Sequence, residues 1–297
     1  MICPLCRKFN VRRLRIERGI EIFECRQCEL GFTNNVTNLM RPHQFGNTLY
    51  DFEGYKKEEK KLRKRFERMI EIIIKYKKSG EVLDIGAGFG LFSSILARSG
   101  RYQIDIIESN LKPYYLRSIP HAFYKVTLER FLAMTKLRDR GDLSIKGKNK
   151  KYDLIILMDV VEHLENPFES LKRIKSFLVK GGILVIQTPN YKSLMARICH
   201  DWAWWMIEDH KYFFSPKSIR IILAKVGLAA KFFITYEDLP DFKKNLDGNF
   251  TLINNIFLRK IIKTLFYSIF FPTYLIARKL LWKFNYGGLI FVIAKKS

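Results

Sequence analysis

The sequence predicts an α/β fold built on a parallel sheet and preceded by a small metal-binding unit. Residues 82–85 are a short apolar run typical of a buried strand, and a glycine-rich turn follows them. The next residues, 91–98, place apolar side chains at helical spacing. Strand, glycine turn and helix form half of a βαβ unit. Two Cys-x-x-Cys pairs within the first 28 residues indicate the metal-binding unit.

The glycine turn has the spacing of a ligand-binding loop. Gly86, Gly88 and Gly90 form G-x-G-x-G, which differs from the G-x-G-x-x-G of dinucleotide binders. Glycines at such a turn let the backbone approach a ligand closely. The predicted second strand, 103–107, ends at Glu108, and a carboxylate there can accept both hydroxyls of a ribose.

Four segments together resemble the class I S-adenosylmethionine-dependent methyltransferases. They are VLDIGAGFG (82–90), DIIESN (105–110), KYDLIILMDVVEHLENP (151–167) and LVKGGILVIQTPN (178–190). The likeness is strongest to small-molecule methyltransferases of the ubiquinone-biosynthesis type, which carry Glu-His after the fourth strand. It implies a Rossmann-like, seven-stranded methyltransferase sheet with helices on both faces, in which 231–239 and 288–296 are the last two strands. A third strand followed by a turn is expected within 121–131.

The resemblance implies S-adenosylmethionine as the cofactor. The residues that match the family's binding positions are Asp84, Gly86, Ala87, Gly88, Gly90, Glu108, Ser109, Leu128, Met158 and Asp159.

The end of strand 152–158 carries the first catalytic candidates. Ligands bind beyond the carboxyl ends of parallel strands, and a helical turn there would put Asp159, Glu162 and His163 on one face. His163 can serve as a general base toward the methyl acceptor. Alternatively the three side chains bind a divalent ion, as the resemblance implies, or Glu162 and His163 only brace the loop.

His210 is the second candidate base. It lies in 199–214, a segment that holds three of the four tryptophans. In the family this segment builds the acceptor pocket, where aromatic walls suit an aromatic ring, a sugar or a lipid head. The alternative is a tryptophan-rich hydrophobic core.

The cysteine pairs predict a four-thiolate zinc ribbon. Cys3 and Cys6 are separated by 18 residues from the second pair, Cys25 and Cys28, and a β-hairpin turning at Arg18-Gly19 is expected between them. So small a unit needs the metal to fold. Cys199 stands apart and is expected in the core.

The sequence divides into a zinc ribbon (1–40), a linker with a basic helix (41–78) and a methyltransferase domain (79–297). Within the last, the insert 240–286 interleaves bulky apolar and basic residues. Its longest uncharged run, 264–277, contains Pro272 and is short of the roughly 20 residues that span a bilayer. We therefore expect a helix pair lying on an anionic membrane, with Tyr274 and Trp282 at headgroup depth, or else a lid or dimer surface.

The formal charge of +24 calls for an anionic partner: nucleic acid, anionic lipid or an acidic substrate. A drift of composition toward lysine is the alternative. The N-terminus has no apolar segment typical of a signal peptide, and paired cysteines without one indicate a cytoplasmic protein, with a peripheral position on the inner face of the membrane as an extension.

Three functions remain at this point. The first is methyl transfer to a small-molecule, sugar or lipid-linked acceptor. The second is an RNA base methyltransferase that uses the ribbon for recognition, against which the Asn/Asp-Pro-Pro-aromatic motif is absent at 159–162. The third is a cofactor-binding scaffold without turnover, against which the intact glycine turn argues.

Overall fold

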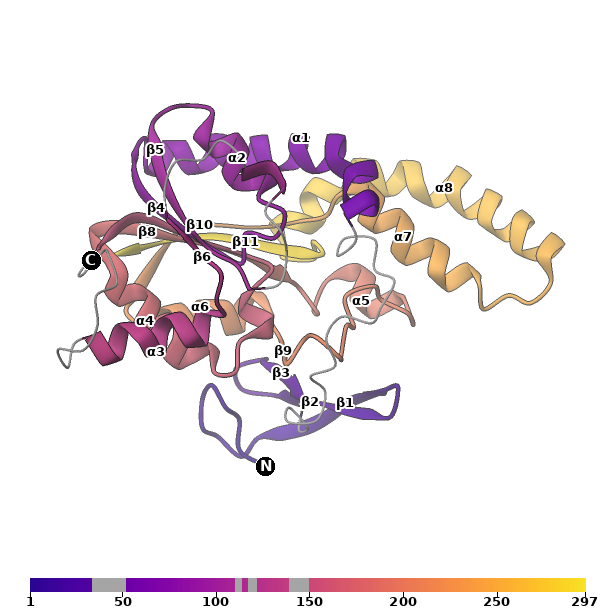
Figure 1. Ribbon diagram of the computed structural model, residues 1–297. Helices are drawn as coiled ribbons and strands as arrows, with labels where there is room; N and C mark the ends of the chain where they lie inside the picture. The colour runs from indigo at the N-terminus through magenta and orange to yellow at the C-terminus, as the bar shows by residue number, and fades with distance from the viewer. Residues whose placement is uncertain (34–51, 110–113, 117–121, 139–149) are drawn as a thin grey trace. The chain divides into compact units, whose positions relative to one another are not determined.

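The computed structural model describes residues 1–33, 52–109, 114–116, 122–138 and 150–297 (Figure 1). The predicted linker up to residue 51 lies outside them. Packing groups the chain into two compact units. One comprises 1–40, 187–222 and 232–292, and the other 41–186, 223–231 and 293–297.

The larger sheet has seven strands, as predicted. Their order is β10-β11-β8-β7-β4-β5-β6, and β4 pairs in parallel with both β5 and β7. The strands are β4 (Gly80–Ile85), β5 (Tyr102–Ile107), β6 (Phe123–Tyr124), β7 (Tyr152–Met158), β8 (Leu178–Pro189), β10 (Leu228–Tyr236) and β11 (Leu289–Lys296). The apolar runs that predicted β4 and β7 are buried because both strands are central in the sheet and helices cover its two faces there.

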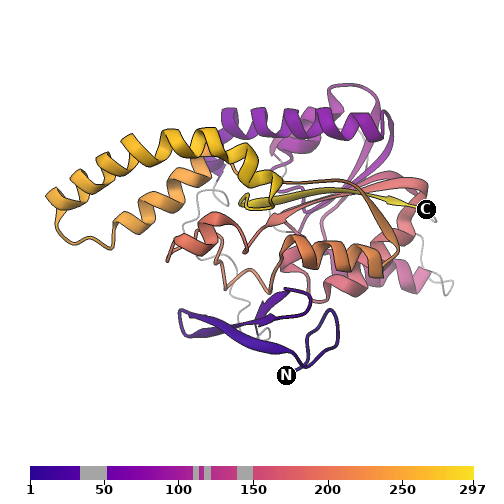
Figure 2. The ribbon, with the colours of Figure 1, turned by 180° about the vertical axis from the view of Figure 1, so that it is seen from behind.

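Helices cover both faces of strands β4 to β7, which confirms the layered α/β prediction. Figures 1 and 2 show α1 (Phe52–Tyr76) and α2 (Leu91–Ala97) on one face, with α3 (Leu128–Arg138) and α4 (Pro167–Phe177) on the other. The start of α4 is capped by Asn166, whose side chain accepts from Glu169 N, and Pro167 follows at the first helical position.

One prediction for this part was confirmed only in its first half. Residues 121–131 were expected to form a strand and then a turn. The strand is present as the two residues of β6, but helix α3, which begins at Leu128, takes the place of the turn. Thr127 starts this helix, because its Oγ1 accepts from Arg130 N at 3.2 Å. Leu128 and Phe131 are buried, and this burial stabilises a helix that the short sequence pattern does not reveal.

The smaller sheet contains the ribbon, in the order β1-β2-β3-β9. Its strands are β1 (Val11–Glu17), β2 (Ile20–Cys25), β3 (Gly31–Thr33) and β9 (Tyr212–Phe213). Arg18 and Gly19 both have positive φ, 46° and 80°, as a two-residue type I′ hairpin turn requires, so the predicted hairpin is confirmed. Residues 31–33, within the predicted ribbon, pair with β2 on one side and with β9 on the other.

The unit that contains the ribbon has its own hydrophobic core. It also includes the helices α5 (Leu194–Ile198), α7 (Leu239–Phe250) and α8 (Ile256–Lys283), with α6 (Pro216–Lys225) at its boundary. The buried members of the core are Ile22, Tyr191, Met195, Cys199, Trp202, Trp205, Ile207, Phe213, Phe242, Leu246 and Tyr274. Cys199 is therefore a core residue as predicted, and Trp202 and Trp205 belong to this core.

The insert forms a helical hairpin of α7 and α8 (Figures 1 and 2). Helix α8 contains Pro272 and still runs as a single helix of 28 residues. Phe271 and Tyr274, on either side of Pro272, pack into the core, and this packing holds the helix together across the proline.

Glu24 connects the ribbon hairpin to the segment after β8. Its carboxylate is only 2% exposed and accepts from Arg12 Nη2 at 2.7 Å and from the Tyr191 hydroxyl at 3.0 Å, and Lys192 completes an ion pair with it. Burial alone would raise the pKa of Glu24, but Lys192 and Arg12 outweigh it and leave the pKa lowered. The ionised carboxylate is therefore part of the folded structure.

We predict that Glu24→Gln lowers the free energy of unfolding by about 2–3 kcal/mol, because it leaves the cations around a buried carboxylate unmatched. Urea denaturation at neutral pH measures the change. Glu21→Gln on the same strand is the control, since the Glu21–Arg13 pair is exposed on both sides and contributes about 0.5 kcal/mol or less. Equal effects of the two substitutions would contradict the role given to Glu24.

Candidate cofactor and catalytic site

The glycine turn after β4 has a backbone that only glycine adopts easily. Gly86, Gly88 and Gly90 have φ values of 72°, 56° and 82°. A Cβ at Gly86 would lie 2.5 Å from Val160 Cγ2, and one at Gly90 would lie 2.3 Å from Leu116 Cγ. The turn is thus tight, and the backbone of Gly86 and Gly90 lies directly against the side chains of Val160 and Leu116. Ala87, a small residue, lies within this turn.

Glu108 follows β5 and lies against this turn. Its side chain is buried, and Oε2 accepts a hydrogen bond from Gly88 N at 2.8 Å. The structure therefore brings together the two features that the sequence singled out on separate strands. Ser109, the next residue, is partly buried.

Asp84 lies beneath the turn. It is buried, and its Oδ2 accepts from Ser93 Oγ at 2.5 Å, which ties β4 to the first turn of α2. Burial raises the pKa of Asp84 to about 7, the negative charge of Glu108 adds to the rise, and the Ser93 hydrogen bond opposes it. The sequence analysis did not identify Ser93 as a partner of Asp84. A polar serine in the otherwise apolar first turn of the predicted helix is a signal that could have indicated it.

The end of β7 does not form the α-helical turn considered for it. Asp159 has a left-handed backbone, with φ of 55°, and a 3₁₀ turn begins only at Val161 and ends at His163. The i, i+3, i+4 argument therefore does not apply to Asp159. Glu162 is buried and His163 partly buried, while Met158 and Asp159 are partly buried at the strand end.

Leu128 is buried at the first position of α3. It has the apolar character expected of a residue that packs against an adenine ring.

His210 belongs to the unit that contains the ribbon, and it is buried there. Its Nδ1 donates to the carbonyl oxygen of Trp204 at 3.1 Å. Because a carbonyl only accepts, this bond selects the tautomer with the proton on Nδ1 and the lone pair on Nε2. That tautomer is the one a general base needs at Nε2.

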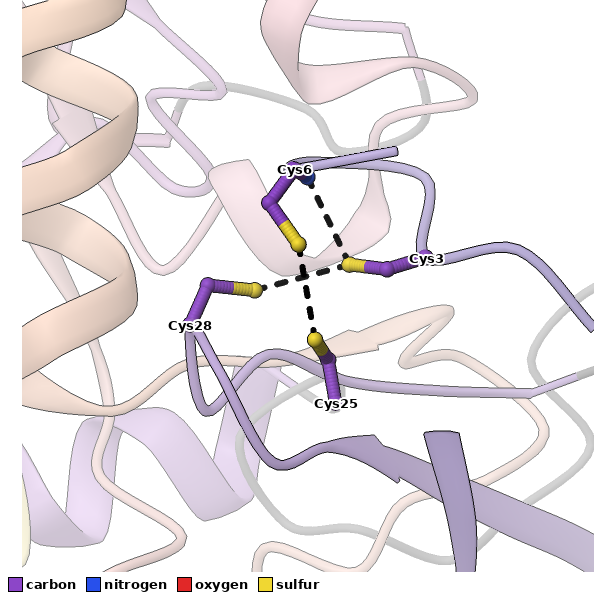
Figure 3. A group of neighbouring side chains, drawn as sticks. All are labelled: Cys3, Cys6, Cys25 and Cys28. Atoms are coloured by element: carbon purple, nitrogen blue, oxygen red, sulfur yellow. Dashed lines mark hydrogen bonds between the residues drawn. The ribbon is translucent and has the colours of Figure 1, made fainter. Parts of the chain in front are cut away.

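The four ribbon cysteines converge, as Figure 3 shows. Cys3 Sγ lies 3.4 Å from Cys28 Sγ, Cys6 Sγ lies 3.4 Å from Cys25 Sγ, and all four sulfurs lie within 4.8 Å of one another. Four thiolates at about 2.3 Å from a tetrahedral zinc ion would be roughly 3.8 Å apart. A disulfide would need about 2.05 Å, so the arrangement fits a metal and not a bridge.

Comparisons with known proteins show which family the chain resembles. Residues 55–230 match the family described as "Methyltransferase domain". The "Ubiquinone biosynthesis O-methyltransferase" of Cereibacter sphaeroides is 29% identical over 154 residues, which cover 50% of this chain and 59% of that protein. The protein of the same name from Caulobacter vibrioides is 30% identical over 173 residues, covering 53% and 64%. The chain thus spans about three fifths of the curated relatives it matches.

A solved structure shows the same fold. It is described as a "SAM dependent methyltransferase from Archaeoglobus fulgidus", and the comparison covers 83% of this chain and all of that one, with a TM-score of 0.53 and 20% identity. The family match takes in the glycine turn, Glu108 and strand β7, which ends at Met158. Because this match covers more than half of the sequence, the chain belongs to the methyltransferase-domain family, as its resemblance to the S-adenosylmethionine-dependent enzymes predicted.

Proposed function

We propose that the protein transfers a methyl group from S-adenosylmethionine to a small-molecule acceptor, with sugar or lipid-linked acceptors included. The observation that carries the proposal is the Glu108 carboxylate, which is buried against the Gly88 backbone at the glycine turn. The names of the curated relatives, which are O-methyltransferases of ubiquinone biosynthesis, support an oxygen acceptor.

The residues at the turn fit the cofactor. The glycine turn would let the backbone approach the cofactor closely, Glu108 would accept the ribose hydroxyls, and Leu128 would pack on the adenine. S-adenosylmethionine supplies a methyl group already activated by its sulfonium. The protein therefore has to position the acceptor and exclude water.

A hydroxyl acceptor also needs a proton acceptor. His163 and His210 are the two candidates, with Glu162 beside the first as a group that can orient it. The tautomer of His210 set by Trp204 suits it to take a proton at Nε2. A divalent ion at Asp159, Glu162 and His163 is the alternative, and activity that survives exhaustive chelation would exclude it.

We propose a cytoplasmic location, since the cysteines of the described residues are unpaired and the ribbon thiols suit a reducing compartment.

Methyl-labelled S-adenosylmethionine tests the function directly. The purified protein is incubated with an extract of cells that lack it, and the label is followed into small-molecule, lipid and RNA fractions. Label in the first two supports the proposal. Label confined to RNA would establish the RNA alternative, and no label in any fraction would favour a scaffold.

We predict that Glu108→Ala weakens S-adenosylmethionine binding roughly 10- to 150-fold, because a charge-assisted hydrogen bond contributes about 1.5–3 kcal/mol. Glu108→Gln should lose less, since its amide oxygen can still accept from Gly88. Calorimetry measures both, with Glu71→Ala on the exposed face of α1 as the control. Unchanged affinity in Glu108→Ala would remove this residue from the site.

A second prediction separates the candidate bases. His163→Ala and His210→Gln are compared for turnover on the labelled acceptor fraction, and loss of the base should lower turnover about 10²- to 10⁴-fold with cofactor affinity retained. Glutamine at 210 keeps a donor for Trp204. His200→Ala, at an exposed histidine, is the control. Full turnover in both test variants would end the base hypothesis.

We further predict one zinc ion per chain. Cys25→Ser should lose the metal and the stability of the unit that contains the ribbon, because the small hairpin depends on the metal. Cys199→Ser is the matched control, since this cysteine is buried in the same unit but is not part of the cluster. Elemental analysis decides, and a full zinc content in Cys25→Ser would refute the four-cysteine site.

A further inference from the structure

The outward face of α8 is apolar and exposed along the length of the helix. Leu258, Ile262, Leu265, Ile269, Ile276 and Leu280 recur at spacings that place them on one side of a helix. Their exposed fractions run from 37% to 85%. Only 6% of the most apolar window of α8 is buried. A surface of this extent is unusual unless something covers it.

The opposite face of α8 is packed within its own unit. Tyr274 stacks on Phe242 of α7, with ring centroids 3.8 Å apart and planes at 14°. Asp247 of α7 pairs with Lys263 at 2.8 Å and accepts from the Tyr267 hydroxyl at 2.9 Å. The helix therefore has a fixed inner side, and the outer stripe is a separate surface.

Charge indicates what covers this stripe. The helix has no acidic residue, and its basic residues lie near its two ends, on either side of the uncharged run 264–277. They are Arg259, Lys260, Lys263, Arg278, Lys279 and Lys283. A second copy of a chain with net charge +24 would bring like charges together, whereas anionic lipid headgroups would be attracted.

We propose that the outer face of α8 binds the surface of an anionic lipid bilayer. The apolar stripe would enter the boundary between headgroups and acyl chains, and Lys279 and Lys283, which flank it by helical spacing, would meet lipid phosphates. Length and composition would also allow α8 to cross a membrane. If α8 crossed the membrane, however, it would lose the contacts that Tyr274 makes with Phe242 and that Asp247 of α7 makes with this helix. The helix therefore lies along the membrane surface.

The structure also corrects one expectation about this segment. Tyr274 was expected at headgroup depth, but its ring is buried in the core. The membrane-binding surface of the protein is therefore formed by the aliphatic stripe rather than by this tyrosine. The proposal concerns binding alone and does not depend on methyl transfer.

Co-sedimentation with vesicles tests the proposal. Vesicles of phosphatidylcholine mixed with phosphatidylglycerol should retain the full chain at low salt, and vesicles of phosphatidylcholine alone should retain much less. Ile269→Asp combined with Ile276→Asp should weaken binding at least about tenfold, because both charges would enter the apolar boundary. Ile198→Asp, at an exposed isoleucine of α5, is the matched control and should bind as the unaltered chain does.

A second pair of substitutions tests the electrostatic part. Lys279→Gln combined with Lys283→Gln should weaken binding to anionic vesicles roughly 30-fold at low salt, since each cation near the surface contributes about fivefold. The difference should shrink as salt is added. An alkaline carbonate wash should release the bound protein.

Three results would overturn the proposal. The first is that the unaltered chain does not bind anionic vesicles at low salt, and the second is that the double aspartate variant binds them fully. The third is protein that resists the carbonate wash, which would mean that α8 crosses the bilayer. Sedimentation velocity adds a check: a dimer that the aspartates dissociate would assign the stripe to a second copy instead.

Discussion

The absence of side chains at Gly86 and Gly90 is the constraint on which the cofactor half of the molecule depends. Both positions combine a left-handed backbone with neighbours so close that a Cβ would overlap Val160 or Leu116. These neighbours belong to the loop after β7 and to the segment after β5. Three chain segments therefore meet at one point because glycine leaves room for them. Glu108 can reach the Gly88 amide only because this convergence holds.

The ribbon is likewise held in place by segments that are distant in the sequence but belong to its own unit. Its sheet continues through β3 into β9, and its hairpin is bound to the tryptophan segment by the Arg18–Glu208 ion pair and by Arg15, whose guanidinium lies 4.8 Å from the centre of the Trp205 ring. His210 lies two residues before β9. The ribbon therefore shares a sheet and a core with the segment that carries a candidate base.

Local patterns predicted most of the elements, and long-range packing accounts for what they missed. The buried strands and the Arg18-Gly19 turn both follow from short stretches of sequence. The pairing of Gly31 with Phe213 joins residues far apart in the chain, and no local pattern contains it. The helix across Pro272 depends on aromatic contacts to α7, and the backbone of Asp159 depends on the packing of its loop. In the candidate site, residue types could be predicted, whereas the Gly88–Glu108 and Asp84–Ser93 hydrogen bonds needed the fold.

The composition of the unit that contains the ribbon has a consequence for synthesis on the ribosome. Its sheet and core draw on the first 33 residues, on the segment from Gln187 to Ile222 and on the helices that end at Lys283. The N-terminal hairpin thus emerges long before the residues that bury Ile22 and pair with Glu24. During that interval only a bound metal ion would order it, because so short a hairpin does not fold alone. If the cysteines hold zinc as proposed, metal supply in the cell would act on the yield of folded protein during translation, before any effect on the finished protein.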